Sequence, residues 1–105
     1  MSFQNPIPLR LKEARKKAKL SQKALGVRIG MDESSASPRM NQYEKGKHTP
    51  DVQTLKLLAD ELGVPLSYFF CEDEISAELA ILISKLPVQE KKTLLESLKI
   101  AIKKS

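Results

Sequence analysis

Apolar residues near the start of the chain recur at helical spacing. Between Leu9 and Lys19, the side chains of Leu11, Ala14 and Ala18 fall at positions i, i+3 and i+7. This spacing places them on one face of a helix, and the lysines of the segment lie largely off that face. The pattern predicts a first helix over residues 9–19.

The next segment is typical of a second, short helix. Ser21 is a good N-cap because its hydroxyl can accept a hydrogen bond from a free amide of the following turn. Leu25 and Ile29 then fall at i and i+4, and Gly30 provides a natural end. We predict a helix over Gln22–Ile29.

A polar stretch follows, GMDESSASPRMNQYEKGKH, from Gly30 to His48. Its acids and serines indicate a turn. Ser35 or Ser37 can cap a third helix, whose first turn then contains the proline of the stretch. Met40 and Tyr43 provide the inward face, and the glycine of the KGK run ends the helix. The third helix is therefore predicted to be polar on its outward side.

Two further helices are predicted before residue 71. Thr49–Asp51 is interpreted as N-cap, N1 and N2 of a fourth helix, which ends at Gly63. Its apolar stripe contains Val52, Leu55, Leu58, Ala59 and Leu62. Pro65 opens a short fifth helix that carries Leu66, Phe69 and Phe70.

The C-terminal third continues with two apolar stripes separated by Pro87. The first contains Ile75, Leu79, Leu82, Ile83 and Leu86, and the second contains Leu94, Leu95, Leu98, Ala101 and Ile102. Both stripes have helical spacing. Ile81 and Ile100 lie on other faces of these helices.

These elements divide the chain into three parts. Pro6 and Pro8 interrupt regular structure, so residues 1–8 are predicted to form a flexible arm. Residues 9–71 form the main domain and residues 72–105 a C-terminal helical extension. The predicted fold class is all-α.

Charge and composition narrow the possible functions. Of the net charge of +5, residues 1–50 contribute +7 and residues 51–105 contribute −2. This asymmetry favours a polyanionic partner for the first half, although a solvated charged surface is the alternative. One Cys and one His cannot build a zinc site of ordinary spacing. The lone Cys fits a reducing cytoplasm, and we expect a cytoplasmic protein without a secretory signal or membrane span.

Several short motifs occur together in the first two thirds of the chain. They are LSQKALG at 20–26, IG at 29–30, YEKGK at 43–47, TP at 49–50, LKLLA at 55–59 and LGV at 62–64. In combination they resemble the lambda-repressor/Cro-like helix-turn-helix family, also called the xenobiotic-response-element type. The resemblance covers residues 9 to about 70. It implies a five-helix DNA-binding domain, to which the tail adds a helical hairpin.

The resemblance also implies roles for individual residues. Arg15 and Glu44 match a family pair that holds the recognition helix on the scaffold. Gly26 matches a position where the second and third helices cross. The interval from Gly30 to Glu44 is longer than usual in the family, and we place the surplus in residues 31–35. Transfer of family positions is therefore secure only after Pro38.

Family-like docking would insert the third helix into the major groove of double-stranded DNA. The expected base-reading residues are Ser37, Arg39, Asn41 and Gln42. Arg39 suits guanine O6/N7, and Gln42 or Asn41 suits adenine. The expected phosphate-contacting residues are Gln22, Lys23, Lys45 and Lys47, with Gln22 and Lys23 at the start of the second helix, where free amides face an anion.

The tail is expected to join two copies of the chain. A monomer would expose Ile81 and Ile100, so we hypothesise an antiparallel hairpin of residues 76–103 that pairs with its mate. The alternative is a hairpin folded onto its own domain.

The leading hypothesis is a sequence-specific transcriptional regulator, most simply a repressor that binds a two-fold operator as a homodimer. The alternatives are an antitoxin that represses its own operon and a helical protein-binding adaptor. An enzyme is disfavoured because no catalytic constellation is evident, and we expect no metal, cofactor or small-molecule ligand.

Overall fold

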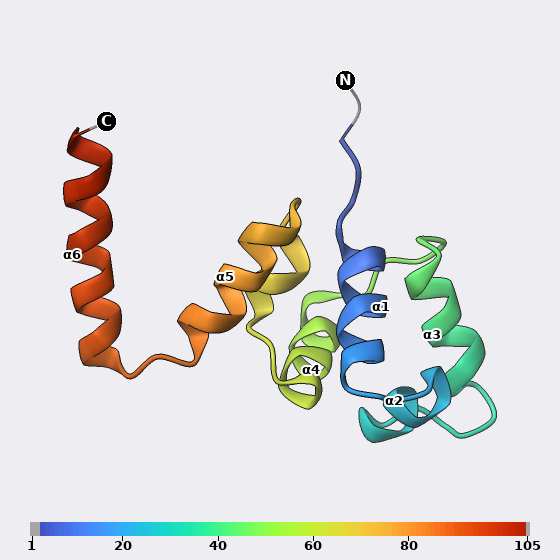
Figure 1. The fold of residues 1–105 in the computed structure, drawn as a ribbon. Coiled ribbons are helices and arrows are strands. Elements are labelled where there is room, and N and C mark those ends of the chain that lie inside the picture. The colour runs from blue at the N-terminus through green and yellow to red at the C-terminus, as the bar shows by residue number, and fades with distance from the viewer. Residues whose placement is uncertain (1–2, 105) are drawn as a thin grey trace.

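The computed structural model describes residues 3–104, and all regular structure in that range is helical (Figure 1). The elements are α1 (Ile7–Lys17), α2 (Gln22–Arg28), α3 (Ala36–Glu44), α4 (Val52–Leu62), a 3₁₀ helix η1 (Leu66–Phe70), α5 (Glu74–Ser84) and α6 (Val88–Lys104). The all-α class with additional C-terminal helices is thus confirmed.

The first helix begins earlier than the sequence pattern predicts. It starts at Ile7, with Pro6 at the N-cap position, and the Ile7 amide donates to the Asn5 side chain at 3.0 Å. Ile7 is buried in the core. The predicted flexible arm of residues 1–8 is therefore wrong at its last two positions, because a proline in the first turn starts this helix instead of interrupting it. Residues 1–2 of that arm lie outside the described residues.

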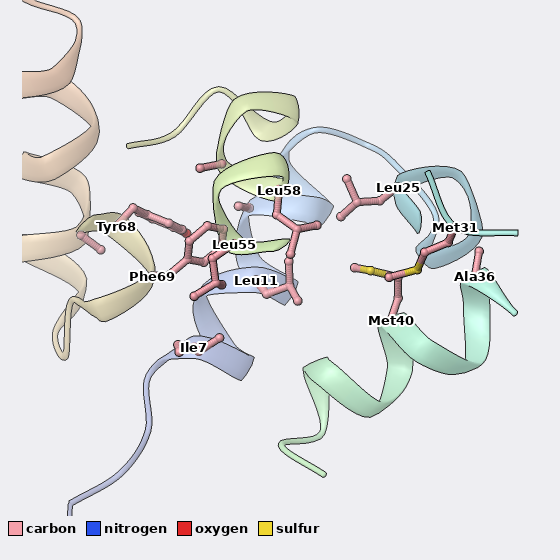
Figure 2. Packing of buried hydrophobic residues seen from close by; sticks show 13 residues of the cluster. Ile7, Leu11, Leu25, Met31, Ala36, Met40, Leu55, Leu58, Tyr68 and Phe69 are labelled. Carbon is pink, nitrogen blue, oxygen red and sulfur yellow. The ribbon is translucent and has the colours of Figure 1, made fainter. Parts of the chain in front are cut away.

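The core is mostly aliphatic and lies between α1, α2, α3, α4 and η1 (Figure 2). Its fully buried side chains include Leu11, Leu25, Met40, Leu55, Leu58, Tyr68 and Phe69. Tyr68 and Phe69 meet edge to face at 5.7 Å between ring centroids. Of the apolar residues that the sequence placed on the fifth helix, Phe70 is exposed. The tighter 3₁₀ turn directs Tyr68 inward together with Phe69.

The crossing of α2 and α3 depends on a glycine. A Cβ added to Gly26 would lie 2.8 Å from the Ala36 Cβ and 3.0 Å from the Met31 sulfur. These distances are too short for a real side-chain contact, so the absence of a side chain at Gly26 lets the first turn of α3 approach α2 closely. The predicted crossing at this residue is confirmed.

The start of α4 differs by two residues from the prediction. Asp51, and not Thr49, is the N-cap, and its carboxylate accepts from the Thr54 amide at 2.7 Å. Pro50 is buried just before the helix. The end agrees with the prediction, because Gly63 adopts a left-handed conformation with φ of 69°.

The two C-terminal helices are present, but α6 does not pack along α5 as in the predicted antiparallel hairpin. After the bend at residues 85–87, α6 extends away from the rest of the molecule (Figure 1), and none of its residues is buried. Only Ala77 of α5 is buried. The antiparallel hairpin predicted over residues 76–103 is therefore not closed by packing within one chain, and its pairing with a second copy stays a prediction. The bend at Pro87 separates two apolar stripes that could otherwise have covered each other.

Candidate nucleic-acid interface

Helix α3 turns one face to the core and the other to solvent. Met40 is fully buried, and Ala36 at the start of the helix is buried against α2. On the other side Arg39 is exposed, and the remaining expected base-reading residues, Ser37, Asn41 and Gln42, are half-buried. The helix N-terminus has no side-chain cap: Ser35 is at the N-cap position, but its hydroxyl donates to the Asp32 carbonyl.

The structure brings Arg15 and Glu44 together, although they are 29 positions apart in the chain. Arg15 Nε and Nη2 donate to the two carboxylate oxygens of Glu44 at 2.6 and 3.0 Å. Both side chains are mostly covered, and Arg15 Nη1 also donates to the Leu20 carbonyl at 2.9 Å. The hydrogen bond to Glu44 raises the pKa of Arg15. This bidentate contact links the C-terminal end of α3 to α1.

A hydrogen-bonded chain extends from this pair to the predicted base-reading surface. The Gln22 side-chain nitrogen donates to Glu44 Oε1 at 3.1 Å and to Asn41 Oδ1 at 3.3 Å. Gln22 was expected at a phosphate, yet its amide donor is directed to α3. The carbonyl oxygen of Asn41 thus accepts a hydrogen bond from Gln22. Its NH₂ group remains available to donate to an acceptor on a base.

The expected phosphate-contacting lysines are exposed, but they differ in their surroundings. Lys23 pairs with Glu33 at 3.1 Å, and both of these side chains are more than half exposed. Lys45 and Lys47 directly follow α3. The backbone amide of Lys47 donates to the Gln42 carbonyl at 3.0 Å, which fixes the turn after the recognition helix.

Two of these contacts were not evident from the sequence. Glu33 lies in residues 31–35, where the surplus relative to the family was placed, and nothing local indicates that it reaches Lys23. The Gln22–Asn41 bond joins two helices across 19 positions. Neither contact produces a periodic pattern in the sequence, so each is evident only in the folded structure.

No group of three or more potential metal ligands occurs among residues 3–104. In the same range no helix is long and apolar enough to span a membrane.

Comparisons with known proteins agree with this arrangement. A helix-turn-helix family model matches residues 11–69. The crystal structure of the transcriptional regulator BswR is similar, with a TM-score of 0.80 and 45% sequence identity, over 89% of this chain and 92% of that one. No curated protein sequence matches. Together with the motifs and the fold, these findings show that the chain belongs to the lambda-repressor/Cro-like, xenobiotic-response-element type helix-turn-helix DNA-binding family.

Proposed function

We propose that the protein is a sequence-specific regulator of transcription that binds a two-fold operator in double-stranded DNA as a homodimer, and that it represses by occluding the promoter. The observation that carries this proposal is the way α3 is held. Arg15, Glu44 and Gln22 fix the helix from behind, and its polar residues remain on the outward side. A rigid polar helix of this kind suits the major groove.

Individual residues of α3 have distinct roles in this proposal. Arg39 is exposed and can donate two parallel hydrogen bonds to guanine O6 and N7. Gln42 can grip adenine N6 and N7, and Ser37 can contact a base or a phosphate. Asn41 can donate to a base acceptor from its NH₂ group while its carbonyl oxygen accepts from Gln22.

The phosphate contacts come from lysines that flank α3. Lys45 and Lys47 are exposed directly after the helix and carry charge without a carboxylate partner within ion-pair distance among residues 3–104. Lys23 contacts a phosphate once its ion pair with Glu33 is broken. Gln22 acts mainly through its hydrogen bond to Asn41 and not through a phosphate. Such phosphate contacts position the protein but carry little sequence information.

The dimer is formed by the C-terminal helices. Large apolar side chains are exposed along both: Ile75, Leu79, Leu82, Ile83, Val88, Leu95, Leu98, Ile100 and Ile102. Exposed large apolar side chains in this number are typical of a protein interface. A polar outward face on α3 and an apolar one on the tail distinguish a DNA-binding dimer from a protein-binding adaptor.

The test is selection of bound sequences from a random pool of duplexes by the full chain. The proposal predicts a two-fold consensus with half-sites about one helical turn apart, ~34 Å between centres. Enrichment of no sequence would contradict DNA reading, and a consensus with a single half-site would contradict binding as a dimer. A reporter gene placed behind the selected site tests repression directly, since expression must fall when the protein is present.

A further inference from the structure

A cluster of polar side chains joins the helix-turn-helix unit to the C-terminal helices. At its centre is Arg10, which is only 1% exposed. Its Nε donates to the Cys71 carbonyl at 2.9 Å, and its Nη1 donates to both carboxylate oxygens of Glu13 at 3.2 and 3.0 Å. The same Nη1 lies 3.2 Å from a carboxylate oxygen of Glu74, the first residue of α5. One guanidinium therefore contacts α1, the link after η1 and the start of α5.

The second member of the cluster, Glu13, is also held from η1. The hydroxyl of the fully buried Tyr68 donates to Glu13 Oε2. Burial alone would raise the pKa of Glu13, but its hydrogen bonds, that from Tyr68 first, lower it below the ordinary value of 4.5. Burial and the contact with Glu13 raise the pKa of Tyr68. Glu13 is therefore an anion at neutral pH, and it keeps Arg10 in place.

Few other contacts determine the direction of α5. The Asp73 carboxylate caps the helix through Ser76, within the same element, and so forms no bond across the joint. Ala77 is the single buried residue of α5, and Ile81 is partly buried against the core. The small Ala77 side chain holds α5 at one point but does not fix the direction of its axis. The Arg10 cluster is thus the set of directional bonds at this joint.

We infer that Arg10 is a positioning residue that fixes the direction in which α5 leaves the helix-turn-helix unit, and thereby sets which spacing between two half-sites the dimer accepts. This inference rests on the proposed function, because it requires binding as a dimer through the C-terminal helices. It concerns no contact with DNA: Arg10 acts at the joint between the helix-turn-helix unit and α5, through which α3 is connected to the C-terminal helices.

The chemistry of the guanidinium explains why this residue suits the task. Its donors lie in a rigid planar fork, so several acceptors are held at fixed mutual angles, whereas a lysine ammonium offers one rotating point charge. Buried ion pairs give little net stability and are best attested as devices that specify one arrangement. Each added base pair moves a half-site by roughly 3.4 Å and rotates it by about 34°. If the joint between the helix-turn-helix unit and α5 is rigid, the two units of a dimer cannot adjust to that displacement. If the joint is loose, they can.

The experiment compares Arg10→Lys with the wild type on duplexes that carry two selected half-sites separated by spacers of increasing length. The matched control is Arg28→Lys, the same substitution in an ion pair between α2 and α4 (Arg28 Nη1 to Glu61 Oε1, 3.1 Å). For Arg10→Lys, preference for the best spacer over one two base pairs longer falls about tenfold, equivalent to ~1.4 kcal/mol. Affinity for a single half-site does not change, and Arg28→Lys keeps the wild-type profile.

A measurement without DNA separates this inference from the proposed function. Spin labels at Gln53→Cys in α4 and Glu78→Cys in α5, with Cys71→Ser and dilution by unlabelled protein, report the distance across the joint. Arg10→Lys must broaden that distribution. If Arg10→Lys does not fold, Glu74→Ala serves in both experiments, because the Glu74 side chain is 68% exposed and its loss spares the core.

The outcomes are distinct. An unchanged label distribution overturns the role of Arg10 at the joint. A broadened distribution with an unchanged spacer profile overturns its role in spacing. If the wild type binds no duplex, the proposed function and the spacing role fail together, and the label distances alone decide whether Arg10 fixes α5.

Discussion

The helix-turn-helix unit and the C-terminal helices differ in how far their apolar side chains are buried. From α1 to η1 most of the large apolar side chains converge on one core, and Leu11, Leu25 and Met40 are fully buried. In α6 no residue is buried, and nine of the fifteen large apolar side chains exposed among residues 3–104 lie after residue 73. The first unit forms its core within one chain, whereas the second leaves most of its large apolar side chains uncovered.

The difference in polar contacts follows the same division. Bonds between elements hold α3 to α1 and α2, through Arg15, Glu44 and Gln22. In α6 the ion pair is local, between Glu96 and Lys99 on the same helix. In the proposed function, the fixed helix α3 reads a groove and the uncovered face of the tail joins two copies.

The largest effect is expected from making the tail polar. The double substitution Leu95→Lys and Leu98→Lys removes two apolar contacts of α6, where the wild-type side chains are about half exposed. We predict a monomer by sedimentation and a loss of operator affinity of roughly a hundredfold, because the second half-site no longer adds to the first. The helical signal and the thermal transition of the first unit should be retained. An unchanged dimer would show that α6 is not the interface.

The next largest effect is expected within the first unit. Arg15→Ala leaves the Glu44 carboxylate covered, with a 2% exposed side chain, and without its bidentate partner. Removal of one member of a buried pair costs about 3 kcal/mol of unfolding free energy, measured by urea denaturation. Lys56→Ala is the control, because the Lys56–Asp60 pair is exposed on both sides and contributes less than ~1 kcal/mol. Equal effects in the two variants would refute the role of Arg15 as an anchor.

A smaller effect is expected at the crossing of α2 and α3. Gly26→Ala gains helix propensity of about 1 kcal/mol but places a Cβ 2.8 Å from the Ala36 Cβ. Overpacking of this kind costs ~1–3 kcal/mol, so we predict a net destabilisation of about 1 kcal/mol in urea. Ala36→Gly in the same chain must recover part of the loss. A Gly26→Ala variant more stable than the wild type would show that α3 can move away freely.

Two substitutions at α3 separate base reading from phosphate contact. Gln42→Ala should relax preference at one base position by about 1–3 kcal/mol. Lys47→Ala should weaken binding to all sequences alike and reduce the slope of log affinity against log salt by about one. Mobility-shift titrations over a panel of single-base variants measure both effects. The assignment is wrong if the two variants change the panel in the same way.

The smallest effect is expected in the connection between α2 and α3. Glu33→Gln releases Lys23 from its exposed ion pair at 3.1 Å. Affinity for every duplex should rise modestly, by no more than ~1 kcal/mol, and the gain should vanish at high salt. Glu90→Gln, an exposed acid in α6, is the control. A loss of affinity in Glu33→Gln would indicate that Glu33 has another role.

The sequence predicted most of the first unit because its signals are local. Caps such as Ser21, the stripe of α4 and the end at Gly63 each follow from residues within one or two turns. The family motifs supplied the pair of Arg15 and Glu44. Local signals also misled in places: Thr49 looked like a cap, but Asp51 takes that role.

What could not be predicted depends on distant or intermolecular contacts. The Gln22–Asn41 bond and the contact of Arg10 with the Cys71 carbonyl join residues 19 and 61 positions apart. The stripes of α5 and α6 correctly predicted two helices. They could not indicate whether the stripes cover each other or a second copy, because amphipathic spacing specifies that a face is to be covered but not by what.

Methylation interference on the selected duplex tests the central claim, that the outward face of α3 reads bases in both half-sites. Guanine N7 methyl groups should block binding at one equivalent position in each half-site, about 34 Å apart. With Arg39→Ala the interference at those two positions should disappear while the remainder of the pattern persists. Interference that is absent in the wild type, or identical in Arg39→Ala, would contradict the account.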